Sequence, residues 1–255
     1  MAAAGLGARR KLDEWIAAGN VQVNGRPAVP GTRVGSGDRV RLFDRDYRVT
    51  AAPAAARTLV YNKPAGVVTS RADPQGRPTV FDRLPPAGDG RWISIGRLDI
   101  NTTGLLLLTT DGELANAMMH PSGGVDREYV CRVHGDVQPE HLEQLKSGVM
   151  LDDGPARVSD IQPGAGDGRN RWFYLVLFEG RNREVRRLWE ALGFTVSRLK
   201  RVRYGAVHLG RLRAGEYREL TAKDHRVLRE DVGLPPLPAE LILTAEKFTI
   251  KPYRR

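Results

Sequence analysis

The 255-residue sequence contains one cysteine, Cys131, and only five histidines. A single cysteine excludes an intramolecular disulfide and a cysteine-based zinc site, and it fits a reducing cytoplasm. The histidines show no i, i+4 pair or other metal-ligand spacing, so a metal enzyme is not expected. No apolar run approaches the roughly 18 to 20 residues that a membrane-spanning helix needs, and we expect neither a secretory signal nor a lipid anchor.

The charge balance points to a polyanionic partner. Forty Lys and Arg against 30 Asp and Glu leave a formal charge of +10 and a pI near 10.1. Such a balance favours nucleic acid or an anionic membrane surface. Without a spanning segment or a lipid anchor, the membrane is the weaker alternative.

Three segments and a tail emerge along the chain. Residues 1–50 predict a helix at 8–18 followed by strands at 21–23, 39–43 and 47–49, with Asn24-Gly25 as a hairpin turn. Residues 51–57 are small and contain a proline, which indicates a linker or a short helix. A larger domain is expected at 58–235, and residues 236–255 are interpreted as a tail.

The larger domain alternates strands with shorter helices. Its strands are predicted at 58–62, 93–96, 105–109, 128–133, 156–161, 172–178, 195–204 and 217–220. Its helices are predicted at 112–119, 139–146, 183–192 and 223–232. Because strands outnumber helices and hairpin-scale spacings are common, we expect an α+β fold with a mixed, mainly antiparallel sheet.

Asp99 stands in a turn between two of these strands, Ile93–Gly96 and Leu105–Thr109. A carboxylate on a loop anchored by sheet at both ends suits a catalytic group. An aspartate beside a strand turn is more often a turn former or a helix cap. The surrounding sequence favours the catalytic alternative.

Residues 96–119 closely resemble the catalytic motif of the RsuA/RluB family of ribosomal RNA pseudouridine synthases. Further segments that resemble sequence motifs of this family lie at 61–66, 73–85, 91–93, 127–130 and 179–189. The resemblance implies a small S4-like RNA-binding module followed by a catalytic domain. It also implies isomerisation of uridine to its C-glycoside, which needs no cofactor because no redox change or group donor is involved.

The S4-like resemblance rests on a basic helix start and a Val-x-Val-Asn-Gly hairpin. It implies RNA contacts from Arg9, Arg10, Lys11 and Asn24, although a basic helix end is often only solvated. The module normally begins about eight residues earlier. We therefore expect either a start codon assigned too far downstream or a trimmed module.

The family match assigns catalytic roles to three residues. Asp99 is the nucleophile or base, and whether it attacks the sugar or removes a sugar proton stays open. Arg186 is expected to pair with it, and the alternative for this arginine is phosphate or solvent. Tyr129 is expected to stack on the uracil, and otherwise it is a plain sheet tyrosine.

Other basic residues are expected to bind RNA. Arg97 matches a residue that enters the space left by the extruded base, with a phosphate contact as the alternative. Residues 181–203 hold eight basic side chains against two acidic ones, which predicts a continuous electropositive face. The expected RNA contacts there are Arg181, Arg183, Arg187, Lys200 and Arg201.

Within the family the chain looks most like the RluB branch, which acts on large-subunit (23S) ribosomal RNA near the peptidyl-transferase region. We therefore expect a cytoplasmic, monomeric enzyme with that RNA or an assembly intermediate as partner. The alternatives are a relative acting on another ribosomal uridine and a non-catalytic RNA-binding assembly factor. DNA binding is less favoured, since no helix-turn-helix or zinc-finger pattern stands out.

Overall fold

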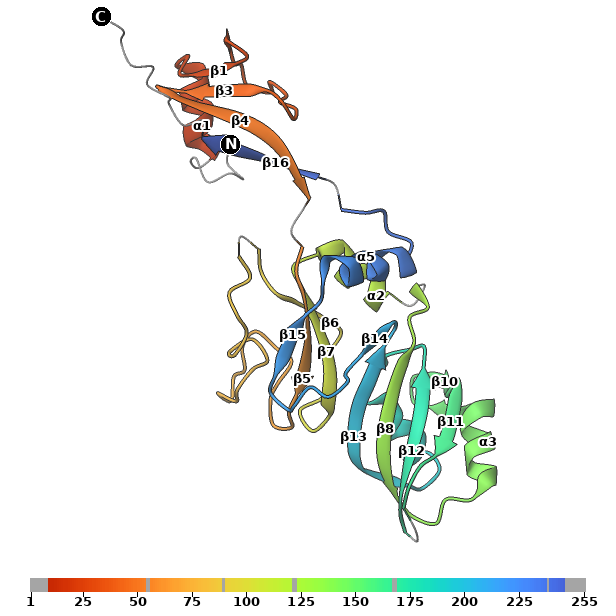
Figure 1. Cartoon of the computed structure of the whole chain (residues 1–255). Helices are drawn as coiled ribbons and strands as arrows, with labels where there is room; N and C mark the ends of the chain where they lie inside the picture. The colour runs from red at the N-terminus through yellow and green to blue at the C-terminus, as the bar shows by residue number, and fades with distance from the viewer. Residues whose placement is uncertain are drawn as a thin grey trace, which may run out of the picture. The chain divides into compact units, whose positions relative to one another are not determined.

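The computed structural model describes residues 9–53, 56–88, 90–120, 123–166, 169–237 and 239–245. The described chain divides into two compact units (Figure 1). Apolar side chains form two buried clusters in one unit and one in the other. The terminal unit combines the residues before 56 with those after 236, and the central unit is formed by residues 56–236. None of the described helices is long and apolar enough to cross a lipid bilayer.

The terminal unit packs one helix on a five-stranded antiparallel sheet of order β16-β4-β3-β1-β2. Its elements are α1 (Arg9–Ala17), β1 (Val21–Val23), β2 (Arg26–Pro27), β3 (Arg39–Leu42), β4 (Arg45–Pro53) and β16 (Ala239–Ala245). Leu12 of α1 is buried, and Trp15 and Ile16 of the same helix pack against the apolar cluster of the sheet. Asn24 and Gly25 join β1 to β2 with φ values of +50° and +77°, so the predicted hairpin turn is confirmed.

The expected linker and tail both contribute to this sheet. Residues 51–53 are the end of β4, so the linker prediction is wrong for them. Residues 239–245 form β16, which pairs antiparallel with β4, so the tail prediction is wrong there. The segment has few residues with a strong strand preference, and its pairing covers an edge of β4 that would otherwise be open. Residues 54–55 and 246–255 lie outside the described part.

The central unit is built on a nine-stranded sheet. Seven strands follow the order β11-β12-β8-β13-β7-β5-β15, with β6 paired to β7 and β14 to β13. The strands are β5 (Thr58–Lys63), β6 (Ile93–Ile95), β7 (Thr103–Thr109), β8 (Arg127–His134), β11 (Asp160–Pro163), β12 (Asn170–Leu177), β13 (Thr195–Tyr204), β14 (Val207–His208) and β15 (Tyr217–Glu219). Among the described strands only β7 and β13 pair in parallel, which confirms the mixed, mainly antiparallel sheet.

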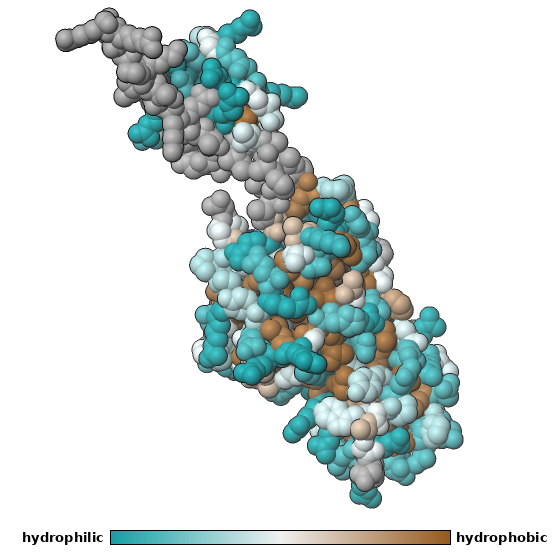
Figure 2. Space-filling view, in the orientation of Figure 1, coloured by the Kyte–Doolittle hydropathy of each residue, from teal (hydrophilic) through white to brown (hydrophobic). Residues whose placement is uncertain are grey.

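Strand β7 is buried on both faces. Leu106 and Leu108 belong to one apolar cluster, and Leu105 and Leu107 to the other. Successive side chains of a strand point to opposite faces, so a continuous leucine run serves two cores at once. On the face seen in Figure 2, hydrophobic residues gather along the middle of the central unit, and hydrophilic residues cover its flanks.

One predicted strand is wrong. Residues 156–161 are not a single strand, because Ala156 ends β10 (Gly154–Ala156) and Asp160 begins β11. Between them the Val158 N–H donates to the Leu145 carbonyl at 2.9 Å, which draws the chain toward a helix instead of a neighbouring strand. β10 pairs with β9 (Val149–Leu151) in a small hairpin that the sequence did not predict.

The four predicted helices of the central unit are confirmed. They are α2 (Gly112–Met119), α3 (Pro139–Ser147), α4 (Glu184–Glu190) and α5 (Ala222–Asp231). Thr221 and Asp224 form a reciprocal capping box at the start of α5. Pro139 occupies the first turn of α3, where its missing N–H costs nothing.

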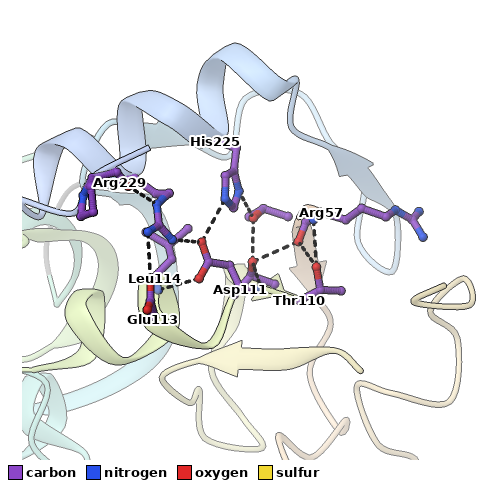
Figure 3. A network of polar contacts seen from close by, with 10 residues as sticks. Arg57, Thr110, Asp111, Glu113, Leu114, His225 and Arg229 are labelled. Atoms are coloured by element: carbon purple, nitrogen blue, oxygen red, sulfur yellow. Dashed lines mark hydrogen bonds and ion pairs between the residues drawn. The ribbon is translucent and has the colours of Figure 1, made fainter. Parts of the chain in front are cut away.

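A buried polar network fastens α5 to the start of α2 (Figure 3). Asp111 caps α2 by accepting from the Leu114 N–H at 3.0 Å. The same carboxylate forms an ion pair with Arg229 and lies 3.2 Å from His225 Nε2, while His225 Nδ1 lies 2.8 Å from the Thr58 hydroxyl. These groups are buried, so each depends on the others for its polar partners.

Candidate active site

A cavity of about 1100 Å³ lies in the central unit. Its walls come from the loop between β6 and β7, from β8 and β13, and from residues 177–185 at the start of α4. The expected catalytic residues Asp99 and Tyr129 both line it, and so does Arg97. The third expected catalytic residue, Arg186, does not line this cavity.

Asp99 lies on a loop held at several points. The Thr102 N–H donates to the Asp99 carbonyl at 3.0 Å, and the Gly66 N–H donates to the Ile100 carbonyl at 2.9 Å. The Thr69 hydroxyl donates to the Leu98 carbonyl at 3.0 Å. The Asp99 side chain is half-buried and accepts no hydrogen bond from any described residue. It caps no helix, so its carboxylate stays free to meet a ligand in the cavity.

Tyr129 faces the cavity from β8 and is 8% exposed. Its hydroxyl accepts a long hydrogen bond of 3.5 Å from Arg201 Nη1. An ordinary tyrosine of the sheet would not need to line a cavity, so this position favours the functional alternative. The structure therefore brings Asp99, from the loop between β6 and β7, and Tyr129, from β8, to one cavity.

Arg186 lies near Asp99 without forming an ion pair with it. Its Nη1 donates to the Val196 carbonyl at 2.7 Å, and its Nε is buried without a partner among the described residues. Burial and the charge of Arg183 lower the pKa of Arg186, whereas the negative charge of Asp99 opposes this shift. The expected direct pairing is thus absent here, and the two side chains interact only through their charges.

Lys63 is a second cation close to Asp99, and the sequence analysis did not single it out. Its side chain is fully buried, and Nζ donates to the carbonyls of Pro64 and Ile100 at 3.0 and 3.3 Å. Burial lowers the pKa of Lys63 to about 8, while the charge of Asp99 acts in the opposite direction. Lys63 lies within the family-like motif at 61–66, and this was the one feature of the sequence that could have indicated its role.

Arg201 is not a surface residue. It is 2% exposed, so the expected direct contact with an RNA phosphate is wrong for this side chain. In a strand, position along the chain decides which face a side chain occupies, and Arg201 faces the cavity wall beside Tyr129.

The continuous electropositive face predicted for residues 181–203 is also wrong. Arg187 forms a bidentate ion pair with Asp153 at 2.8 and 2.9 Å. Arg181 pairs with Glu179 at 2.5 Å, and Arg203 pairs with Asp126 at 2.7 Å. Counting charges within this segment could not reveal Asp153 and Asp126, which are 34 and 77 residues from their partners along the chain.

Several expected RNA contacts do remain accessible in the central unit. Arg97 is exposed at the cavity and forms no ion pair with a described residue. Arg183 is exposed and makes only a 3.3 Å contact with Glu190. Lys200 lines a second, shallower hollow of about 530 Å³ together with Arg211 and Arg213.

The RNA-binding residues predicted in the terminal unit differ in how accessible their side chains are. Arg10 is exposed, and Lys11 lies with its Nζ 5.6 Å from the centre of the Trp15 ring. Arg9 begins α1, but its side chain lies outside the described part. Asn24 donates to Asp38 and accepts from the Arg39 N–H, both at 2.9 Å, so its polar groups already stabilise the hairpin.

Two further buried charges line the cavity. Arg127 is 7% exposed and donates to the carbonyls of Val125, Phe178 and Met118. Glu184 is 4% exposed at the start of α4, and burial raises its pKa. Both residues lie within family-like sequence motifs, but no neighbouring residue in the sequence indicated that their side chains are buried. Within the described residues no cluster of three or more potential metal ligands occurs.

The chain is similar to known proteins over most of its length. A family model described as RNA pseudouridylate synthase matches residues 57–191, and an S4 domain model matches residues 1–40. A solved structure described as a crystal structure of pseudouridylate synthase superposes with a TM-score of 0.60 and 28% identity. That superposition covers 88% of this chain and 95% of the other.

Three bacterial relatives illustrate the similarity, and all are named ribosomal large subunit pseudouridine synthase B. The Pseudomonas aeruginosa protein is 56% identical over 93% of this chain and 62% of its own length. The Vibrio cholerae protein is 53% identical over 92% of this chain and 74% of its own. The Shigella flexneri protein is 51% identical over 100% of this chain and 87% of its own. The match covers a smaller share of the longer relatives, 50% of the Xylella fastidiosa protein and 39% of the Xanthomonas axonopodis protein.

Proposed function

The chain belongs to the RNA pseudouridylate synthase family, and we propose that it converts a uridine of large-subunit ribosomal RNA into pseudouridine. The observation that carries the proposal is the Asp99 carboxylate. It faces a cavity large enough for a nucleoside, accepts no hydrogen bond from any described residue, and shares the cavity with Tyr129.

The reaction breaks the N1–C1′ bond of uridine and joins C5 to C1′. The C5 hydrogen leaves as a proton, and N1 gains a proton, so the product is an isomer with no net oxidation. No group donor is therefore required. Asp99 serves either by attacking the sugar or by removing a sugar proton, and an ionised carboxylate suits both roles.

Two cations support a carboxylate in this position. The charges of Lys63 and Arg186 both interact with that of Asp99. An opposite charge offsets the cost of placing a carboxylate in a partly desolvated cavity. We assign Arg186 this electrostatic role and Tyr129 the contact with the uracil ring.

The RNA reaches the cavity from its exposed rim. The target base has to leave its stack, at a cost of a few kcal/mol, and the exposed Arg97 is placed to occupy the space that it leaves. Arg183 at the rim and Lys200 in the second hollow offer phosphate contacts, and Arg10 and Lys11 offer others in the terminal unit. The proposed setting is the cytoplasm, with the chain acting as a monomer.

The decisive experiment replaces Asp99 with Asn. A strain lacking the gene is complemented with wild type, Asp99→Asn or Asp136→Asn, and pseudouridines in its ribosomal RNA are mapped. Asp136 is an exposed aspartate outside the cavity and serves as the matched control. Wild type and the control should restore one large-subunit site. The Asp99 variant should lower the rate there by at least about a hundredfold while still binding the RNA.

Two outcomes would change the assignment. Full activity of Asp99→Asn would remove Asp99 from catalysis. If wild type binds ribosomal RNA but modifies no uridine, the chain is instead a non-catalytic assembly factor. If the modified uridine lies outside large-subunit RNA, the proposed reaction stands and only the proposed RNA substrate is wrong.

A further inference from the structure

Arg201 is a buried cation without a carboxylate partner. It is 2% exposed on β13, and it forms no ion pair with any residue that the structure describes. Its Nε donates to the Leu105 carbonyl at 2.8 Å, and Nη1 donates to the Tyr129 hydroxyl at 3.5 Å. Nη2 is buried and has no hydrogen-bond partner among the residues that the structure describes. A buried charge without a partner destabilises the folded chain, so the position of Arg201 indicates a role other than stabilising the fold.

A neighbouring arginine shows what a satisfied buried guanidinium looks like here. Arg127 lies over the Tyr204 ring at 4.7 Å and directs its terminal nitrogens to four backbone carbonyls and the Tyr204 hydroxyl. Arg201 lies over the same ring at 4.9 Å but has only two acceptors. Arg127 therefore has a structural role, whereas Arg201 lies at the cavity wall with part of its hydrogen-bonding capacity unused.

The contacts of Arg201 join the strand that follows the Asp99 loop to the strand that carries Tyr129. Leu105, which accepts from Nε, belongs to β7, the strand that directly follows the Asp99 loop. Tyr129, which accepts from Nη1, belongs to β8. Arg201 itself pairs through its backbone with Gly104. One side chain therefore fixes the phenol of Tyr129 relative to the strand that positions Asp99.

The direction of the hydrogen bond has a chemical consequence. A guanidinium can only donate, so the Tyr129 oxygen must accept from Arg201. The hydrogen of the phenol is then left for another acceptor, and Tyr129 lines the cavity. A positive charge behind a hydroxyl also strengthens it as a donor.

We propose that Arg201 is a positioning residue that turns Tyr129 into a hydrogen-bond donor to the uracil and supports the negative charge that the base acquires. The inference rests on the proposed function and deepens it. When the N1–C1′ bond breaks, its electron pair stays on N1, and the charge spreads over O2 and O4 of the uracil. The base then turns, a pair from C5 forms the new bond to C1′, the C5 proton leaves, and N1 takes up a proton. Preorganised donors stabilise such a transient anion.

The test compares Arg201→Met, Arg201→Lys and Arg127→Met with wild type in steady-state kinetic assays on ribosomal RNA. Arg201→Met should lower kcat by about 10- to 100-fold with KM changed less than about threefold. Arg201→Lys keeps the charge and should recover part of the rate. The melting temperature of Arg201→Met should stay within about 4 °C of wild type, whereas Arg127→Met, which loses more hydrogen bonds, should fall further.

A double-mutant cycle tests whether Arg201 acts through Tyr129. In a Tyr129→Phe background, Arg201→Met should cost no more than about threefold in rate, because the hydroxyl that it orients is gone. Equal losses in both backgrounds, a change in KM alone, or an unfolded Arg201→Met protein would overturn the proposal. If wild type itself makes no pseudouridine, the proposed function fails instead, so the two failures are distinguishable.

Discussion

The backbone of Arg201 lies where a side chain at position 104 would have to stand. A Cβ built on Gly104 would be 2.2 Å from the Arg201 carbonyl oxygen and 2.9 Å from its nitrogen. Gly104 also has a φ of +98°, which other residues rarely adopt. This contact lies where β7 and β13 pair in parallel, so glycine at 104 allows the strand after the Asp99 loop to approach the strand of Arg201.

Gly104→Ala should therefore destabilise the chain by about 2–4 kcal/mol, since overpacking and left-handed strain add. Urea unfolding would measure the loss. Gly193→Ala is the matched control, because Gly193 has a φ of +82° but nothing within 4 Å of an added Cβ. A control that costs as much as Gly104→Ala would show that backbone strain alone explains the effect.

Lys63→Met should change how stability depends on pH. Burial lowers the pKa of Lys63 from 10.5 to about 8 in the folded chain, so the unfolded chain holds that proton more tightly. Wild-type stability should gain up to about 3 kcal/mol from this residue as pH rises from about 8 to about 10.5. The variant lacks this gain. The free energy of unfolding of both proteins, measured from pH 7 to 10.5, checks it, and a pH-independent difference would contradict it.

Asp111→Asn should be costly at neutral pH and much less so in acid. Burial alone would raise the pKa of Asp111, but hydrogen bonds from His225, the Leu114 N–H and Arg229 hold it well below 3.8. The stabilisation is present above pH 3.8 and is lost as pH falls from there toward the lowered folded value.

At pH 7 we expect Asp111→Asn to cost about 3 kcal/mol, because Arg229 and His225 lose a buried carboxylate. Glu113→Gln is the matched control. Glu113 also pairs with Arg229, but its side chain is 72% exposed, so its loss should cost little. Chemical unfolding at pH 7 and pH 3 would measure both variants. A difference between wild type and Asp111→Asn that does not narrow in acid would argue against the assigned cause.

Removing residues 237–255 should loosen the terminal unit selectively. β4 loses the seven-residue partner β16 and becomes an open edge. Limited proteolysis should cut residues 9–53 at least about tenfold faster, with the central unit unchanged. A shorter deletion, of residues 246–255, keeps β16 and serves as the control. Equal protection in both deletions would mean that β16 adds no stability.

Local sequence signals were enough for most elements of the central unit. The helix Gly112–Met119 and the strand Thr195–Tyr204 were predicted with the bounds observed, because a capping aspartate and a run of strand-forming residues act locally. The failed strand at 156–161 shows the limit of such signals. There a hydrogen bond from Val158 to the distant Leu145 carbonyl decides the path of the chain.

The candidate site divides in the same way. Asp99 and Tyr129 could be predicted from family-like motifs and a strand turn, and both lie at the cavity. The pairing of Arg187 with Asp153 and the burial of Arg201 could not be predicted. Both depend on residues that approach only after the chain has folded.

Neighbouring residues and short motifs were sufficient to predict the type and order of most elements, the family, and the aspartate and tyrosine proposed to act on RNA, because such signals are local along the chain. The folded chain was needed to show which of the many cations are exposed, paired or buried. It was also needed to show that residues 239–245 complete a sheet begun near the other end of the chain. Burial and charge pairing depend on distances in space between residues far apart in sequence, and charge counts along the chain carry no such information.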